Sequence, residues 1–146
     1  MGTAYVALGS NLGERKQNLQ QALAAMRKHG LNVTRVSSFI ETEPYGVTDQ
    51  PRFLNGACEV VTGLAPERLL SELLAIETEM GRERKRHWGE RNIDLDLLLY
   101  DDVIMQTAQL TLPHPDMLNR DFVLLPLKEI APDAVHPVVK KRICEL

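Results

Sequence analysis

The segment Ile93-Asp94-Leu95-Asp96-Leu97-Leu98-Leu99 decides how this sequence folds, because it is the clearest β-strand pattern in the chain. Successive side chains of a strand point to opposite faces, so one face is expected to pack against helices. The apolar side chains expected on that face are Ile93, Leu95, Leu97 and Leu99. Asp94 and Asp96 are expected together on the other face, with Cα atoms about 7 Å apart. That face turns apolar at Leu98, which confines the acidic pair to the head of the strand.

The other elements follow from hydrophobic periodicity and from the glycine and proline residues at their ends. We predict strands at 3–9, 31–42, 53–61 and 93–100, and helices at 14–29, 66–80 and 119–130. Alternation slips near Arg35–Val36, which indicates a bulge, and Pro126 weakens the middle of the last helix. The order strand-helix-strand-strand-helix-strand matches the split βαβ arrangement. We therefore predict an α+β, ferredoxin-like βαββαβ sandwich with C-terminal additions, forming a single domain over residues 1–146.

Composition bounds the cellular setting and the class of partner. The 146 residues are 44% hydrophobic, which is enough for a core without cross-links. Cys58 and Cys144 form neither a disulfide framework nor a zinc ligand set. Residues 1–13 lack the basic start of a signal peptide, and no apolar run reaches the roughly 20 residues that span a bilayer. With a net charge of −3, we expect a cytoplasmic protein that binds neither nucleic acid nor membrane.

A basic segment directly precedes the acidic pair. Residues 82–91 hold five cations and two anions, a local charge of +3 that leaves −6 for the rest of the chain. The cations are Arg82, Arg84, Lys85, Arg86 and Arg91. Guanidinium groups bind phosphate through two parallel hydrogen bonds, and Trp88 is expected to cover a ligand when the loop closes. The alternative is a solvated charged loop, in which Glu83 and Glu90 offset part of the charge.

Paired carboxylates beside clustered cations favour phosphoryl transfer, in which catalysis is mainly positioning and charge neutralisation. Asp94 and Asp96 are suitable oxygen ligands for one or two Mg²⁺ ions. Taken alone, the Asp-x-Asp pattern is also compatible with a solvated strand edge that carries two ordinary aspartates. The chain lacks the phosphate-loop motif G-x-x-x-x-G-K-[ST], so arginines and metal would have to hold a bound nucleotide.

Six motifs occur in order along residues 3 to about 135. They are ALGSNLG at 7–13, Ser38–Thr42 leading into Pro44 and Gly46, DQPRFLN at 49–55, GRER at 81–84, HWGERNIDLD at 87–96, and PHP at 113–115 with NRDFV at 119–123. Each motif is weak alone, but the ordered set is specific. It resembles the 6-hydroxymethyl-7,8-dihydropterin pyrophosphokinase family of the folate pathway.

The resemblance implies that the terminal pyrophosphate of ATP moves to the hydroxymethyl group of the reduced pterin, leaving AMP, without a covalent enzyme intermediate. It implies that Asp94 and Asp96 are catalytic and hold two Mg²⁺ ions, and that Arg82 and Arg91 stabilise the transition state and the product. The residues implied to bind ATP are Leu70, Glu77, Arg84, Trp88, Leu97, Leu110, Thr111, His114 and Arg120.

The reduced pterin requires a flat slot with aromatic walls and an amide that reads the ring edge. The resemblance places Phe53 and Phe122 as the walls and Asn55 as the amide. The other implied pterin contacts are Gly9, Asn11, Thr42, Glu43 and Pro44. Considered singly, the two phenylalanines are also typical core residues, and His114 is also typical of a structural histidine. The assembled set favours the binding role.

Two other functions fit parts of the sequence. Ferredoxin-like sheets with a basic loop also occur in RNA-binding modules, but residues 93–100 carry acids where bases would stack. A degenerate regulatory domain is disfavoured because every motif position is intact. We expect a monomer that acts on two small molecules, ATP and the reduced pterin. The acceptor of the hydroxymethyl proton is either Asp96 or solvent.

Overall fold

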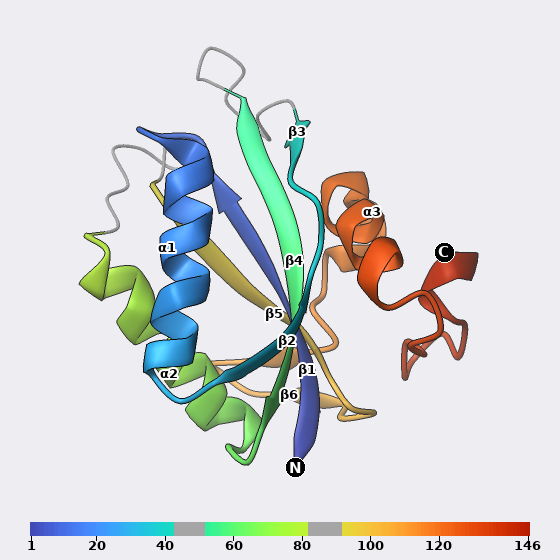
Figure 1. Cartoon of the computed structure of the whole chain (residues 1–146). Coiled ribbons are helices and arrows are strands. Elements are labelled where there is room, and N and C mark those ends of the chain that lie inside the picture. The colour runs from blue at the N-terminus through green and yellow to red at the C-terminus, as the bar shows by residue number, and fades with distance from the viewer. Residues whose placement is uncertain (43–51, 82–91) are drawn as a thin grey trace.

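The computed structural model describes residues 1–42, 52–81 and 92–146 (Figure 1). Its strands are β1 Gly2–Ser10, β2 Asn32–Val36, β3 Ile40–Thr42, β4 Phe53–Thr62, β5 Asp94–Tyr100, β6 Met105–Gln106 and β7 Thr111–Leu112. Its helices are α1 Arg15–Lys28, α2 Pro66–Glu79 and α3 Asp121–Ile130, with 3₁₀ turns η1 Met117–Asn119 and η2 Ile143–Glu145.

The main sheet is antiparallel and has the strand order β2-β4-β1-β5, with β3 paired to β4 on the same edge as β2. Helices α1 and α2 cover one face of this sheet, and α3 covers part of the other (Figure 1). The connectivity from β1 to β5 is the βαββαβ arrangement, and α3 and the segments around it are additions near the C-terminus. The predicted α+β, ferredoxin-like fold is confirmed.

The first two helices form where the sequence places an apolar stripe between clear end signals. Helix α1 buries Leu19, Leu23 and Met26, and the chain leaves it through Gly30 at φ +84°, a conformation that favours glycine. Helix α2 begins with Pro66 at its first position, where the missing N–H removes no helical hydrogen bond. Both stripes pack on the same sheet face in one core cluster.

The predicted strand at 31–42 is divided into β2 and β3. The interruption is stabilised by Ser37, whose backbone N–H donates to the Ala57 carbonyl at 2.9 Å and whose hydroxyl accepts the Ala57 N–H at 2.8 Å. The register against β4 shifts between Val33 and Arg35, so the irregularity lies one or two residues before the predicted position.

The prediction that Leu99 shares a face with Leu97 is wrong. Tyr5 of β1 pairs with Leu99, but the next residue, Val6, pairs with Leu97, so β5 carries one extra residue, Leu98. This bulge turns the end of the strand over. Leu97 therefore packs under α1 and α2, whereas Leu98 and Leu99 pack under α3.

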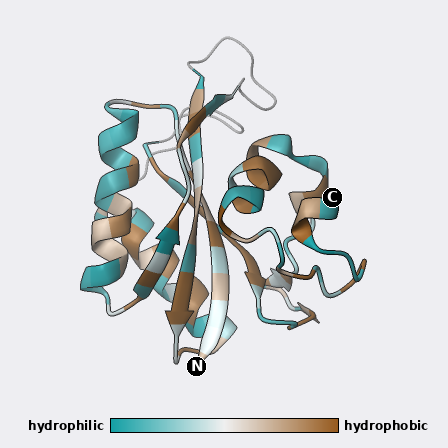
Figure 2. Ribbon diagram, turned by 45° about the vertical axis from the view of Figure 1, so that its right-hand side comes forward, coloured by the Kyte–Doolittle hydropathy of each residue, from teal (hydrophilic) through white to brown (hydrophobic). Residues whose placement is uncertain are grey.

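Helix α3 begins at Asp121, two residues later than predicted, because Arg120 has extended backbone dihedrals. It contains Pro126 and is the most apolar of the three helices, whereas α1 is mainly hydrophilic (Figure 2). The β6–β7 hairpin and the short bridge between Val135 and Arg142 were not predicted.

None of the helices in the described ranges is both long enough and apolar enough to cross a membrane.

Candidate active site

Two rows of residues across β4, β1 and β5 form the floor of the candidate site. The rows are Asn55–Gly9–Asp94 and Ala57–Ala7–Asp96. Ala7 and Ala57 pack with the cluster under α3, so both rows belong to the sheet face on that side. Asp94 and Asp96 thus share a face, opposite Leu95 and Leu97, as the alternation predicts. Both aspartates are half-buried at the head of an edge strand, with small residues beside them on β1.

A cavity of about 520 Å³ opens beside the acidic pair, between α2, the start of β5 and residues 107–120. Predicted site residues that line it are Leu70, Glu77, Asp94, Asp96, Leu97, Leu110, Thr111, His114 and Arg120. This set includes every predicted ATP-binding and metal-binding residue in the described part of the chain. The fold therefore brings four separate stretches of sequence to one cavity wall.

The buried carboxylate of Glu77 attaches α2 to the acidic strand. It is 5% exposed, and its Oε2 accepts the backbone N–H of Leu95 at 2.7 Å. Leu95 stands between the two aspartates, so this hydrogen bond fixes the backbone that carries both. Glu77 therefore has two roles, because it lines the predicted nucleotide cavity and also holds β5. The sequence pattern does not indicate the second role.

His114 is held so that one ring nitrogen is a donor near neutral pH. Its backbone N–H donates to the Leu98 carbonyl at 2.9 Å, which attaches the segment after β7 to β5. Its Nδ1 accepts the backbone N–H of Asp116 at 3.2 Å. Burial, and then the nearby Arg120 charge, lower the pKa of the imidazole. The neutral ring with Nδ1 accepting carries its proton on Nε2, which can donate to a phosphate oxygen.

Arg120 connects the cavity to the first turn of α3. Its guanidinium pairs with Asp116 at 3.4 Å, and its Cζ lies 5.8 Å from the ring centroid of Phe122. Its side chain is only 15% exposed, so its conformation is already restricted. A phosphate that binds it would therefore cost little further side-chain entropy. Phe122 is half-buried against the cluster under α3.

Four of the predicted pterin residues meet at the other side of the floor. The buried Asn55 donates through Nδ2 to the Thr42 hydroxyl at 2.5 Å, and Thr42 is the strand partner of Phe53. A Cβ at Gly9 would lie 2.9 Å from Asn55 Oδ1, so any larger residue would force the Asn55 amide to move. Asn11 is buried just beyond the end of β1. Phe122 lies on α3, which contacts β1, β3 and β4.

Six predicted site residues lie outside the described residues. They are Glu43, Pro44, Arg82, Arg84, Trp88 and Arg91.

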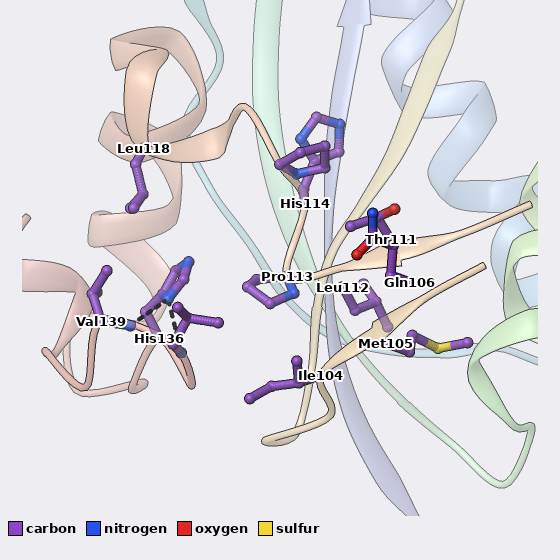
Figure 3. A pocket seen from close by; sticks show the side chains of 12 residues that line it. Ile104, Met105, Gln106, Thr111, Leu112, Pro113, His114, Leu118, His136 and Val139 are labelled. Carbon is purple, nitrogen blue, oxygen red and sulfur yellow. Dashed lines mark hydrogen bonds between the residues drawn. The ribbon is translucent and has the colours of Figure 1, made fainter. Parts of the chain in front are cut away.

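A second cavity, of about 490 Å³, is lined by residues 111–115 together with the start of the β6–β7 hairpin and residues near the C-terminus (Figure 3). Thr111, His114 and Pro115 line both cavities. Across the second cavity, the Nδ1 of His136 accepts the backbone N–H groups of Val138 and Val139 at 3.3 Å each, and burial lowers the pKa of this imidazole. Most of the residues that line it are apolar, and they include Met105 and Leu112 of the β6–β7 hairpin and Val139 near the C-terminus (Figure 3). His114 therefore borders both cavities.

Two contacts near the site join residues distant in sequence. Asn92 donates through Nδ2 to the Met80 carbonyl at 2.7 Å, which attaches the residue two positions before β5 to the C-cap of α2. Arg15 donates to the Arg52 carbonyl and to Glu41. The sequence gives one hint of the Arg15 contacts. A cation in the first turn of a helix opposes the helix dipole, so an arginine there indicates a role outside the helix.

A comparison with known protein families connects this geometry to an enzyme class. Residues 5–132 match the model described as 7,8-dihydro-6-hydroxymethylpterin-pyrophosphokinase. The chain belongs to this family. Its floor, its acidic pair and the described part of its cavity all fall within the matched range.

Relatives support membership in the pyrophosphokinase family. A Haemophilus influenzae protein named 2-amino-4-hydroxy-6-hydroxymethyldihydropteridine pyrophosphokinase is 49% identical over 138 residues, covering 94% of this chain and 86% of that protein. The protein of the same name from Bacillus subtilis is 50% identical over 128 residues, covering 87% and 77%. The crystal structure of wild-type Plasmodium falciparum HPPK-DHPS has a TM-score of 0.77 at 15% identity. It covers 98% of this chain, which spans 43% of that larger protein, and it supports the fold alone.

Proposed function

We propose that this protein transfers the diphosphoryl group of ATP to the hydroxymethyl group of 6-hydroxymethyl-7,8-dihydropterin, giving the pterin diphosphate and AMP in folate biosynthesis. The observation that carries this function is a family match over residues 5–132 that contains a cavity bordered by paired aspartates. The acidic pair lies on the floor, with the cavity on one side and the Asn55–Thr42 pair on the other. A reaction between ATP and a flat heterocycle needs two adjoining subsites of this kind.

The residues present fit Mg²⁺. Asp94 and Asp96 offer hard carboxylate oxygens from one strand face, and both line the cavity. Mg²⁺ in phosphoryl-transfer enzymes is commonly held by one or two carboxylates together with substrate phosphates and water. We propose that these two aspartates bind two ions with the ATP phosphates. When bound, the metal neutralises phosphate charge and aligns the reacting groups.

The cavity residues have distinct proposed tasks on ATP. Leu70, Leu97 and Leu110 enclose the nucleoside, and Thr111 offers a hydroxyl beside it. His114, through Nε2–H, and the guanidinium of Arg120 donate to phosphate oxygens. Glu77 lines this wall and holds Leu95 in place. The family resemblance assigns stabilisation of the transition state and the product to Arg82 and Arg91, and ATP binding to Arg84 and Trp88.

On the pterin side, we propose that Asn55 and Thr42 read the polar edge of the ring, while Phe53 and Phe122 lie against its faces. Gly9 leaves space for the ring to approach the floor. The resemblance adds contacts from Asn11, Glu43 and Pro44.

In the transfer step, the hydroxymethyl oxygen forms a bond to the β-phosphorus of ATP. The bond between that phosphorus and the α–β bridging oxygen breaks, and the oxygen leaves with AMP. The hydroxymethyl proton passes to Asp96 or to solvent. No covalent bond to the protein is required.

A nucleic-acid-binding role is not favoured. Asp94 and Asp96 occupy the sheet face on which an RNA-binding ferredoxin-like module would stack bases. We propose that the protein acts as a monomer in the cytoplasm.

The experiment that tests the proposal is turnover by three aspartate variants with chromatographic detection of AMP. The wild type is expected to form AMP only when ATP, Mg²⁺ and the dihydropterin are all present. Asp94→Asn and Asp96→Asn are each expected to abolish turnover with little change in unfolding temperature, because both groups lie on the half-buried floor. Asp102→Asn is the matched control, since it removes a carboxylate just beyond the other end of β5. Substantial activity in either floor variant, or equal loss in the control, would contradict the assignment.

A further inference from the structure

The first residue of α1, Arg15, joins three parts of the chain. Its Nη1 donates to the backbone carbonyl of Arg52 at 2.9 Å, and its Nη2 lies 2.5 Å from Glu41 Oε1. Glu41 is the central residue of β3, and Arg52 directly precedes β4. These partners are 26 and 37 residues from Arg15 in sequence, so one guanidinium holds the end of β3, the start of β4 and the start of α1 together.

Arginine is an unfavourable choice for this position if only the helix is considered. The start of a helix carries a partial positive charge, and a cation there costs about 0.3–1 kcal/mol. The first turn of α1 contains no acidic residue, and Glu14 at the N-cap makes no capping hydrogen bond through its side chain. Helix formation therefore does not explain Arg15, whereas its two contacts outside the helix do.

Arg15 secures a short strand whose preceding residues are fixed to β4 by the two hydrogen bonds between Ser37 and Ala57. β3 is three residues long, and its pairing with β4 comprises Ile40 with Asn55, Glu41 with Leu54 and Thr42 with Phe53. A shift by one residue would move every side chain of β3 to the other sheet face. Thr42 would then no longer accept the hydrogen bond from Asn55, whose Nδ2 lies 2.5 Å from the Thr42 hydroxyl.

We propose that Arg15 is a positioning residue for the pterin subsite, which holds β3 against β4 so that Thr42 and Asn55 are aligned before the substrate arrives. The inference rests on the proposed function, because it assigns the Thr42–Asn55 pair to the pterin. Arg15 does not contact the reacting atoms in this account. Its side chain is 29% exposed and that of Glu41 is 49% exposed, so the alternative is an ordinary surface ion pair with little effect.

The test compares Arg15→Gln with Lys16→Gln. Lys16 is the next, exposed residue of the same helix turn, so both variants remove one cation from the start of α1, but only the first removes the two contacts. For Arg15→Gln we expect the KM for the dihydropterin to rise three- to tenfold, the order expected when about 1 kcal/mol from the loss of both partly exposed contacts falls on the pterin complex. The KM for MgATP and kcat are expected to stay within about twofold, as for any change that weakens binding equally in the ground and transition states. Lys16→Gln is expected to match the wild type in all three quantities.

Two further measurements separate positioning from general stability. Arg15→Lys is expected to be intermediate, because a single ammonium lacks the fork that reaches both partners. Hydrogen exchange of the β3 amides, measured without substrates, is expected to be faster in Arg15→Gln than in Lys16→Gln, with unfolding temperatures of the two variants alike. An unchanged dihydropterin KM in Arg15→Gln, an equal rise in both KM values, or a lysine variant that matches the wild type would overturn the proposal. A wild-type protein that forms no AMP would instead overturn the proposed function, and the exchange measurement would still test the contact.

Discussion

The substitution Gly9→Ala tests the close approach of β1 to the predicted pterin amide. A Cβ at this position would lie 2.9 Å from Asn55 Oδ1 and 3.7 Å from Phe53 Cδ1. Ordinary contact begins near 3.4 Å, so the amide of Asn55 must move by about 0.5 Å. That movement acts on a group whose Nδ2 is already 2.5 Å from the Thr42 hydroxyl. The added methyl group therefore perturbs the pterin side of the floor directly.

The magnitude of the effect follows from two costs. Inserting a methyl group into a packed site costs about 1–3 kcal/mol, and a weakened side-chain hydrogen bond costs about 1 kcal/mol. If about 1.4 kcal/mol of this falls on the pterin complex, dihydropterin binding weakens roughly tenfold. Gly9 does not line the 520 Å³ cavity that is assigned to ATP, so MgATP affinity is expected to stay near the wild-type value.

The assay is calorimetric titration of the dihydropterin and, separately, of a non-hydrolysable ATP analogue. Gly63→Ala is the matched control, because the nearest atom to its added Cβ is the flexible Met1 Sδ at 3.7 Å. The penalty of Gly9→Ala is expected to shrink in an Asn55→Ala background, where the clashing oxygen is absent. Wild-type pterin affinity in Gly9→Ala, or an undiminished penalty in the double variant, would refute the assigned contact.

Three further predictions concern other parts of the molecule. His29 contacts Glu72 through Nδ1 at 2.8 Å and Glu79 through Nε2 at 2.7 Å, and hydrogen bonds to Glu72 first and Glu79 second raise its pKa. The stabilisation that His29 gives the folded state is therefore complete below the unfolded-state pKa near 6.5 and is lost as pH rises through the higher folded-state pKa. In urea unfolding, His29→Gln should lower the free energy of unfolding by up to about 1 kcal/mol at pH 6 and by less at pH 9. A loss of the same size at both pH values would contradict this prediction. His114→Ala is expected to weaken MgATP binding about five- to tenfold in calorimetry at pH 7 without weakening dihydropterin binding, and an equal effect on both ligands would exclude the phosphate-donor role. Asn92→Ala removes the hydrogen bond to Met80, the C-cap residue of α2, so thermal denaturation should show a loss of about 1 kcal/mol, and an unchanged midpoint would show that the bond does not contribute.

Elements with a strong local pattern were predictable to within one or two residues. The apolar stripes of α1 and α2 end at glycines and, for α2, begin at Pro66, so their limits are specified locally. The bulge at Leu98 was not predictable, because a run of three leucines from 97 to 99 suits either face. The separation of β2 from β3 depends on Ser37 bonding to Ala57, twenty residues away. The two-residue strands β6 and β7 carry too little pattern of their own.

The candidate site shows the same division between local and long-range information. Alternation alone predicts that Asp94 and Asp96 share a face, and the structure confirms it. The row that joins Asn55, Gly9 and Asp94 requires the strand order, which periodicity does not specify. A cation at the start of α1 marks Arg15 as unusual in the sequence, but its partners lie 26 and 37 residues away, so only the folded chain identifies them.

The fate of the phosphorus atoms of ATP tests the central claim most directly. Wild-type protein is incubated with Mg²⁺, the dihydropterin and ATP labelled at either the α- or the γ-phosphorus, and the products are separated and weighed by mass spectrometry. We expect the α-label to be recovered in AMP, and the γ-label in a pterin product whose mass corresponds to two added phosphoryl groups. Recovery of the α-label in ADP, with a pterin product that carries one phosphoryl group, would contradict this expectation.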